Sequence, residues 1–159
     1  MSDLVRRVGS GVLAGLAGAA AMKAALWLWH SATLDNPRHG AYGLDDQADI
    51  DSAKMLSNAI AGIDLSDSTA KAVGVAMHYG YGAGAGALYA LLADEEPVIR
   101  AGMGTAFGAF LWLTVDEIGV SVTGLSDPRS KSLAAHAAAL GVHLLYGWVV
   151  ETVQERVGL

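Results

Sequence analysis

Cysteine is absent from this sequence, and basic residues are scarce. The lack of cysteine excludes disulfide bonds, thiolate metal sites and cysteine nucleophiles. The 10 lysines and arginines stand against 16 aspartates and glutamates, which gives a formal net charge of −6. A chain without a basic patch cannot displace counterions from phosphates, so we expect no nucleic-acid binding. Charged residues make up only 16% of the 159 residues, against about 25% in an average soluble domain.

Proline is also rare, and its positions divide the chain into four long apolar runs. The three prolines, Pro37, Pro97 and Pro128, all lie between these runs, where they punctuate helices. Each run has about 20–25 residues, enough to cross roughly 30 Å of hydrocarbon at 1.5 Å per residue. The sequence therefore predicts an all-α fold, an integral membrane four-helix bundle in a single domain over residues 1–159. The predicted spans are residues 8–32, 71–93, 99–123 and 131–152.

A soluble, alanine-rich helical bundle is the alternative architecture. Its helices would need polar faces, because a helix in water normally turns charged and polar side chains to the solvent. Stretches such as "GVLAGLAGAAAM" and "MGTAFGAFLWLTV" offer no such face. The membrane interpretation is therefore preferred.

Residues 35–70 form an acidic loop between the first two predicted spans. Apolar side chains recur in it at helical spacing, with acidic residues opposite, which predicts an amphipathic helix that lies on the membrane surface or caps the bundle. The apolar positions are Ile50, Ala53, Leu56, Ile60 and Ile63. The aspartates of this loop lack the glycine and the final glutamate of an EF-hand, so no metal site is predicted.

Small residues four positions apart recur in three of the runs. In lipid the hydrophobic effect does not drive one helix against another, so close approach of the backbones matters more. Glycines at this spacing permit that approach. The predicted helix-packing residues are Gly11, Gly15, Gly80, Gly84, Gly104 and Gly108.

Ionisable residues inside the apolar runs are the candidate functional residues. Counted from the middle of each run, four of them fall in the same half of the membrane, toward the long loop: Lys23, His78, Asp116 and His136. A lone charge at mid-membrane costs about 2.5–3.5 kcal/mol, so pairing of Lys23 with Asp116 or Glu117 would offset the cost. The predicted intramembrane polar cluster comprises Lys23, His78, Asp116, Glu117, His136 and His143. Glu151 is predicted at the opposite membrane interface.

Structural roles are the alternative for each of these groups. Lys23 could extend along its stem to the lipid headgroups, and the histidines could be neutral, hydrogen-bonded core residues. A b-type haem is a further alternative, because bis-His ligation needs histidines that face each other from different helices. His78 with His136 or His143 would meet that need. Otherwise no cofactor is predicted, and no nucleophile has a convincing acid–base partner, so the protein is predicted not to be an enzyme.

Three stretches of the sequence form a recognisable combination. The last run, "HAAALGVHLLYGWVVETVQERV", carries a histidine, a glutamate eight positions later and a basic amphipathic exit. The glycine-rich "GVLAGLAGAAAMKAALW" bears one lysine, and "GVAMHYGYGAG" has a histidine early in its run. The combination resembles the YagU-like family of bacterial inner-membrane proteins, through Lys23, His78, His143 and Glu151. The resemblance implies several membrane spans, no settled biochemical activity and a link with acid tolerance.

These observations lead to one expected function and two alternatives. The expected protein is a small inner-membrane protein of acid or stress tolerance, or of proton and ion homeostasis, acting through the polar cluster. The first alternative is a membrane-embedded interaction or assembly subunit, whose glycine faces pair with a second copy or another membrane protein, and the second is the b-type cytochrome. The expected location is the bacterial cytoplasmic membrane, with lipid as the surrounding partner. Arg6 and Arg7 before the first span favour a cytoplasmic N-terminus.

Overall fold

The computed structural model describes residues 3–32, 47–119, 121 and 132–157 of the chain. Within these ranges every regular element is helical, which confirms the predicted all-α class for the described residues. In chain order the elements are α1 (Asp3–Ala32), α2 (Gln47–Ala61), α3 (Asp67–Leu92), the 3₁₀ turn η1 (Pro97–Arg100), α4 (Thr105–Leu111), the π-helix η2 (Trp112–Gly119) and α6 (Leu133–Val157).

Two helices among the described residues are long and apolar enough to cross a membrane. They are α1, over Asp3–Trp29, and α6, over Leu133–Val157. They correspond to the first and last predicted spans, although α6 continues past residue 152 and Lys131 lies outside the described residues. The predicted span 71–93 coincides with the continuous helix α3 except for its last residue, and α3 begins where Ser66 caps the amide of Thr69. Glycines and polar side chains lower the mean hydropathy of α3, so it is not among the helices that are apolar enough to cross a membrane.

The predicted span 99–123 is not one continuous helix. Three successive residues after η1, Gly102, Met103 and Gly104, have φ of 63°, 59° and 81°, which is left-handed backbone. Glycine adopts this conformation at little cost, so the chain turns here without a proline. The helix begins again only at Thr105, and α4 with η2 extends roughly 20 Å at about 1.5 Å per residue. The spacing of prolines alone therefore missed a break that glycine makes.

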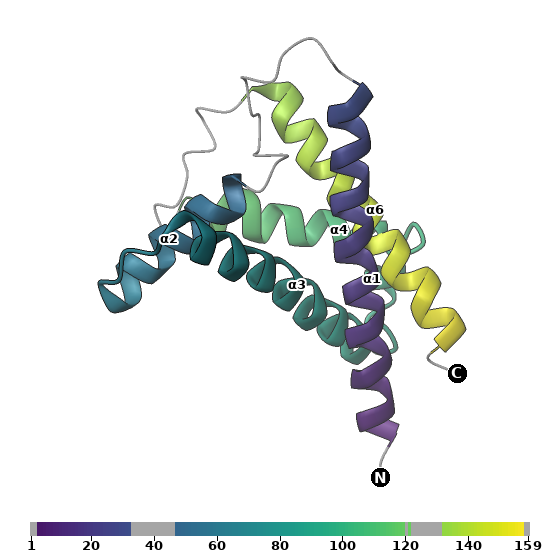
Figure 1. The fold of residues 1–159 in the computed structure, drawn as a ribbon. Helices are drawn as coiled ribbons and strands as arrows, with labels where there is room; N and C mark the ends of the chain where they lie inside the picture. The colour runs from purple at the N-terminus through teal and green to yellow at the C-terminus, as the bar shows by residue number, and fades with distance from the viewer. Residues whose placement is uncertain (1–2, 33–46, 120, 122–131, 158–159) are drawn as a thin grey trace.

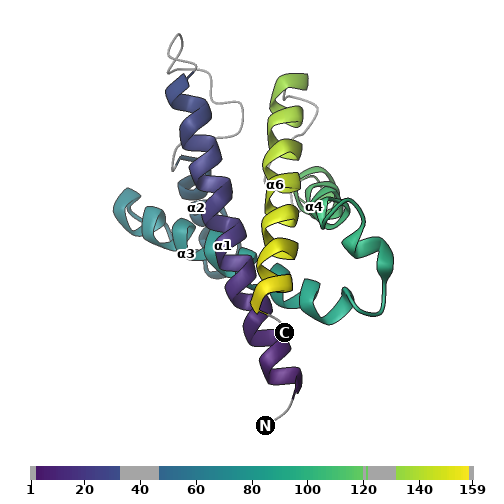
Figure 2. The same ribbon diagram turned by 90° about the vertical axis from the view of Figure 1, so that its right-hand side faces the viewer.

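The two long apolar helices lie side by side and run in opposite directions. Figure 1 shows α1 rising from the N-terminus while α6 descends beside it to the C-terminus, and Figure 2 shows the same pair from a second direction. In Figure 2, α2 and α3 lie toward one side of this pair and α4 toward the other. The contacts agree with the view, since α3 packs on α1, α4 packs on α6, and α2 packs on α3.

Glycines set the contact between α1 and α3. A Cβ added to Gly11 would lie 2.5 Å from the carbonyl oxygen of Gly86, and a Cβ on Gly82 would lie 2.6 Å from the Cβ of Ala19. Gly15 is equally close to the Gly82 backbone. The two backbones therefore touch over several turns of an antiparallel pair, at a separation that only glycine permits.

The structure corrects the choice of glycines on α3. The predicted pair Gly80 and Gly84 faces outward, with nothing within 4 Å of an added Cβ. The residues that face α1 are Gly82 and Gly86, two positions later. A shift of two residues turns a helix by about 200° at 3.6 residues per turn, so these two pairs occupy opposite faces. Spacing identified a small-residue helix but could not say which of its two glycine stripes is the inner one.

A second glycine contact joins α4 to α6. A Cβ on Gly104 would lie 2.9 Å from Cβ of Glu151, and a Cβ on Gly108 would lie 2.7 Å from the carbonyl carbon of His143. From the other side, a Cβ on Gly147 would lie 2.9 Å from the amide nitrogen of Gly108. The start of α4 thus follows α6 antiparallel at backbone contact, as predicted for Gly104 and Gly108.

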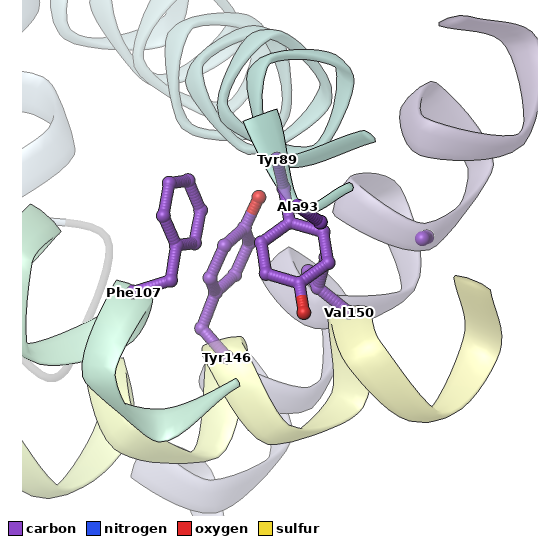
Figure 3. Close-up of a cluster of buried hydrophobic side chains, with 6 residues drawn as sticks. Tyr89, Ala93, Phe107, Tyr146 and Val150 are labelled. Carbon is purple, nitrogen blue, oxygen red and sulfur yellow. The ribbon is translucent and has the colours of Figure 1, made fainter. Parts of the chain in front are cut away.

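Aromatic side chains fill the space where α1, α3, α4 and α6 meet. Tyr89 of α3 meets Phe107 of α4 edge to face, with ring centroids 5.0 Å apart, while Tyr146 and Val150 come from α6 (Figure 3). The Tyr146 hydroxyl donates to the Gly82 carbonyl oxygen at 2.6 Å. Its ring lies against Gly18 of α1, where an added Cβ would come within 2.6 Å. Buried hydroxyls in this core are therefore satisfied by helix partners.

The amphipathic helix predicted in the loop is α2, and it docks on α3. Ala53 is fully buried, and the backbone of Asp49 lies so close to Gly74 that an added Cβ would be 2.5 Å from its carbonyl oxygen. The predicted apolar face is only partly covered, since Ile60 is 77% exposed and Ile63, beyond the end of the helix, 53%. Residues 35–46 of the predicted loop lie outside the described residues.

Candidate functional site

Polar side chains gather at both ends of the α1–α6 pair. The end that holds Lys23, Asp49, Glu117 and His136 is called the histidine end, and the end that holds Arg7, Asp94, Arg100 and Glu151 is called the arginine end. Between them lie the glycine contacts and the aromatic core. Both chain termini lie toward the arginine end (Figure 1).

At the histidine end, Glu117 of η2 faces His136 of α6. The distance between Nδ1 of His136 and Oε1 of Glu117 is 2.7 Å. An ionised carboxylate only accepts hydrogen bonds, so Nδ1 carries the hydrogen in this contact. The side chains are 23% and 19% exposed, so the pair is partly shielded from solvent.

Asp116, the neighbour of Glu117 on η2, faces a second histidine of α6. Oδ2 of Asp116 lies 3.7 Å from Nδ1 of His143, which is beyond hydrogen-bonding distance. Nδ1 of His143 already donates to the carbonyl oxygen of Ala139 at 2.8 Å. Two consecutive acids of η2 thus face two histidines that lie seven positions apart on α6.

The π-helix explains how neighbouring acids reach the same helix. A π turn closes i to i+5 hydrogen bonds and holds more residues than an α turn, so consecutive side chains point in more similar directions. Asp116 and Glu117 both lie within the eight residues of η2. Stretches of π-helix are rare and are concentrated at functional sites.

The predicted Lys23–Asp116 pair is replaced by other partners. The Lys23 ammonium forms an ion pair with Asp49 of α2, and both side chains are partly buried. His78 places Nε2 3.1 Å from the carbonyl oxygen of Ala19 on α1. The structure therefore divides the predicted cluster into a lysine contact beside α2 and two histidine contacts beside η2. Their positions along the predicted spans placed these residues in the same half of the membrane. In the structure they lie on faces that the α1–α6 pair separates.

The histidines considered as haem ligands face different parts of the molecule. His78 bonds to α1, whereas His136 and His143 face the carboxylates of η2. Within the described part of the chain, no three His, Asp or Glu side chains are grouped as metal ligands.

At the arginine end, Glu151 is the most deeply buried charged residue in the described chain, only 4% exposed. The Tyr89 hydroxyl donates to its Oε2, and Nε of Arg100 donates to its Oε1 at 2.8 Å. Arg100 also reaches Glu155 through Nη2 at 3.3 Å. The hydrogen bond and the charge of Glu151 raise the pKa of the Arg100 guanidinium. The carboxylate therefore ties α3, η1 and α6 together.

Sequence reasoning found Glu151 but missed its partners. It also missed Arg7, which bonds to Asp94 at 2.8 Å and to the carbonyl oxygen of Ala90 at 3.1 Å. One signal was present: Arg100 precedes Gly104 by four residues, as Gly147 precedes Glu151. Once the two glycines are placed in contact, antiparallel pairing brings the arginine and the glutamate together.

No protein-family model, curated protein or solved structure matches this chain. The class that the structure defines is therefore an all-helical protein with two helices long and apolar enough to cross a membrane. The resemblance to the YagU-like family stays a prediction.

Proposed function

We propose that the protein is a small, non-enzymatic protein of the bacterial inner membrane whose η2–α6 contact responds to protons. Support for the membrane begins with the exposure of α1 and α6. Only 28% of the apolar window of each helix is buried inside the protein. The core helix of a soluble protein would be mostly buried, so these surfaces call for an apolar solvent.

The ends of α1 support the same placement. Trp27 and Trp29 are exposed at one end, and Arg6 and Arg7 lie near the other. Tryptophan is enriched at membrane–water interfaces and arginine at cytoplasmic ends. The 20 residues from Arg7 to Trp27 extend about 30 Å along a helix, which matches the thickness of the hydrocarbon core. In this proposal α3 and the α4–η2 segment complete a four-segment bundle, with the N-terminus in the cytoplasm.

A simple measurement tests the membrane placement. Cells expressing the full chain are lysed, and the membranes are washed with alkaline carbonate. The protein is expected to remain with the membranes and to need detergent for release. Recovery in the wash without detergent contradicts the proposal.

The pairing of Asp116 and Glu117 with two histidines of α6 is the observation that carries the acid response. Histidine is the side chain that changes charge in the physiological pH range. When His136 and His143 take up protons, each carboxylate gains a cation as its partner. Opposite charges 4 Å apart attract by about 4 kcal/mol at an effective dielectric constant of 20, before the desolvation cost is subtracted. Acidification should therefore tighten η2 against α6.

Hydrogen–deuterium exchange in detergent or nanodiscs tests this response. After correction for intrinsic exchange rates, the amides of residues 112–119 should be better protected at pH 5.5 than at pH 8. Glu117→Gln should lose a large part of that change, because a protonated imidazole attracts a neutral amide less than a carboxylate, while the Asp116–His143 contact remains. Glu155→Gln, which also removes one carboxylate from the chain, serves as the matched control and should keep it. An equal response in all three proteins would overturn the proposal.

Assembly with another membrane helix is the second candidate function. It is favoured by Gly80 and Gly84, which leave open space on the outer face of α3. A face of this kind allows a neighbouring helix to approach closely. Crosslinking of the protein in membranes should give a dimer or a discrete complex that Gly84→Leu abolishes, and an unchanged pattern would argue against this candidate.

A further inference from the structure

A polar cavity opens at the arginine end, where α1, α3, η1 and α6 meet. Its volume is about 370 Å³, near the lower end of the range for small-molecule sites. Three guanidinium groups and three carboxylates line it: Arg6, Arg7, Arg100, Asp94, Glu151 and Glu155. The lining carries no net formal charge. A ligand that carries both a negative and a positive group can contact both kinds of side chain.

The guanidinium groups retain the capacity to bind a phosphate. Arg7 makes its contacts with Asp94 and Ala90 through Nη2, and Arg100 uses Nε and Nη2 for Glu151 and Glu155. Each arginine has five N–H donors, so these contacts use fewer than the side chain offers. Arginine is the preferred residue for phosphate because its donors match two oxygens at once.

Asp94, at the rim of the cavity, points to a cationic donor in the ligand. Its side chain is 63% exposed and so remains accessible. An ammonium group could donate to this carboxylate, whereas a phosphate could not, because both groups are acceptors.

We propose that this cavity binds a phosphoethanolamine group. Arg7 and Arg100 hold its phosphate, and Asp94 accepts hydrogen bonds from its primary ammonium. The proposal rests on the membrane placement of α1, which puts Arg7 at the level of the lipid headgroups. Guanidinium groups at this level can contact the phosphates of lipid headgroups. We therefore assign the group to a phosphatidylethanolamine lipid rather than to a soluble molecule.

Native mass spectrometry of the full chain tests the assignment. The protein is released from micelles that contain equal amounts of phosphatidylethanolamine, phosphatidylcholine and phosphatidylglycerol. The phosphatidylethanolamine adduct should dominate, because choline has no N–H to donate and glycerol has no positive charge. Loss of one charge-assisted contact should weaken retention about tenfold. Arg7→Gln should show that loss, while Arg156→Gln, the same change at an exposed arginine of α6, should not.

The remaining experiments test which part of the headgroup is recognised and whether the group belongs to a lipid or to a soluble molecule. Asp94→Asn should reduce the preference for ethanolamine over choline and leave total phospholipid retention nearly unchanged. Equal retention of the three lipids, preference for phosphatidylglycerol, or an equal effect of Arg7→Gln and Arg156→Gln would each overturn the proposal. Displacement of the lipid by an equal concentration of free phosphoethanolamine would overturn the lipid assignment. A chain that needs no detergent would instead contradict the membrane placement, so the two failures are separate.

Discussion

Substitution of two glycines on α3 by alanine should have opposite effects on stability. Gly86 faces α1, where an added Cβ would lie 2.6 Å from Cα of Gly15. Gly84 lies two residues earlier, and an added Cβ would have nothing within 4 Å. Both positions are inside the same helix. The chemical change is identical, so only the surroundings differ.

The magnitude follows from two opposing terms. Alanine favours the helix over glycine by about 0.8–1.0 kcal/mol at either position. At Gly86 the new methyl group meets backbone rather than a flexible side chain, so α1 and α3 must move apart, which typically costs about 1–3 kcal/mol. The helix term cancels in a comparison of the two variants. We expect Gly84→Ala to be the more stable of the two by about 1–3 kcal/mol.

Thermal unfolding in detergent, followed by near-ultraviolet circular dichroism of the four tryptophans, measures the difference. For a chain of this size, 1 kcal/mol corresponds to about 2–4 °C in Tm. The two variants should therefore differ by roughly 2–12 °C. Gly11→Ala changes the opposite wall of the contact and should reproduce the loss seen for Gly86→Ala.

Equal Tm values for Gly84→Ala and Gly86→Ala would refute the reasoning. So would a lower Tm for Gly84→Ala, because it would identify the outer stripe as the packed one. Either result would mean that the α1–α3 contact is not formed by Gly82 and Gly86.

Three further predictions concern the polar contacts. Glu151→Gln should lower the free energy of unfolding by about 1–3 kcal/mol, because a buried charged acceptor is lost. Glu155→Gln changes an exposed pair and should lower it by at most about 1 kcal/mol. Similar losses of Tm in the two variants would contradict this prediction. Lys23→Asp and Asp49→Lys should each speed deuterium exchange in α2, and the double variant should restore protection if the two groups pair. The hydrogen bond and the charge of Lys54 lower the pKa of Asp67 below its ordinary 3.8. The folded chain therefore binds fewer protons near that pH than the unfolded chain does. The Lys54–Asp67 contact stabilises α2 above pH 3.8, and this stabilisation is lost as the pH falls through the folded pKa. An NMR titration of the Asp67 carboxyl with a midpoint at or above 3.8 would exclude this contribution.

Local pattern was sufficient to locate most of the helices. The apolar runs and their proline boundaries predicted the regions of α1, α3 and α6, because long apolar stretches without proline favour helix. The same reasoning failed at residues 102–104, where two glycines and Met103 turn the chain. A glycine inside an apolar run is compatible with both a packed helix and a left-handed turn. Only the neighbouring backbone decides between them.

The candidate sites depended on tertiary register, which local pattern does not contain. Depth along each run placed Glu151 at the end opposite the predicted cluster, where the structure has it beside Arg100, but it could not predict that Asp49 would reach Lys23. That contact exists because the absence of a side chain at Gly74 lets α2 approach α3. Likewise, Asp116 and Glu117 attracted notice as acids in an apolar run, but their shared orientation toward α6 depends on the π-helix. Such a helix is too rare to predict from composition.

The contacts of α1 with α2 and α3 have a consequence for the order of assembly during synthesis. The Gly15–Gly82 contact and the Lys23–Asp49 ion pair involve only residues that precede η1. At about 5–20 residues per second, the ribosome needs roughly 2–8 s to go from residue 94 to Leu133, where α6 begins. An N-terminal hairpin can therefore close on itself well before α6 emerges. α6 then packs onto helices that are already assembled, with Tyr146 against Gly18 of α1.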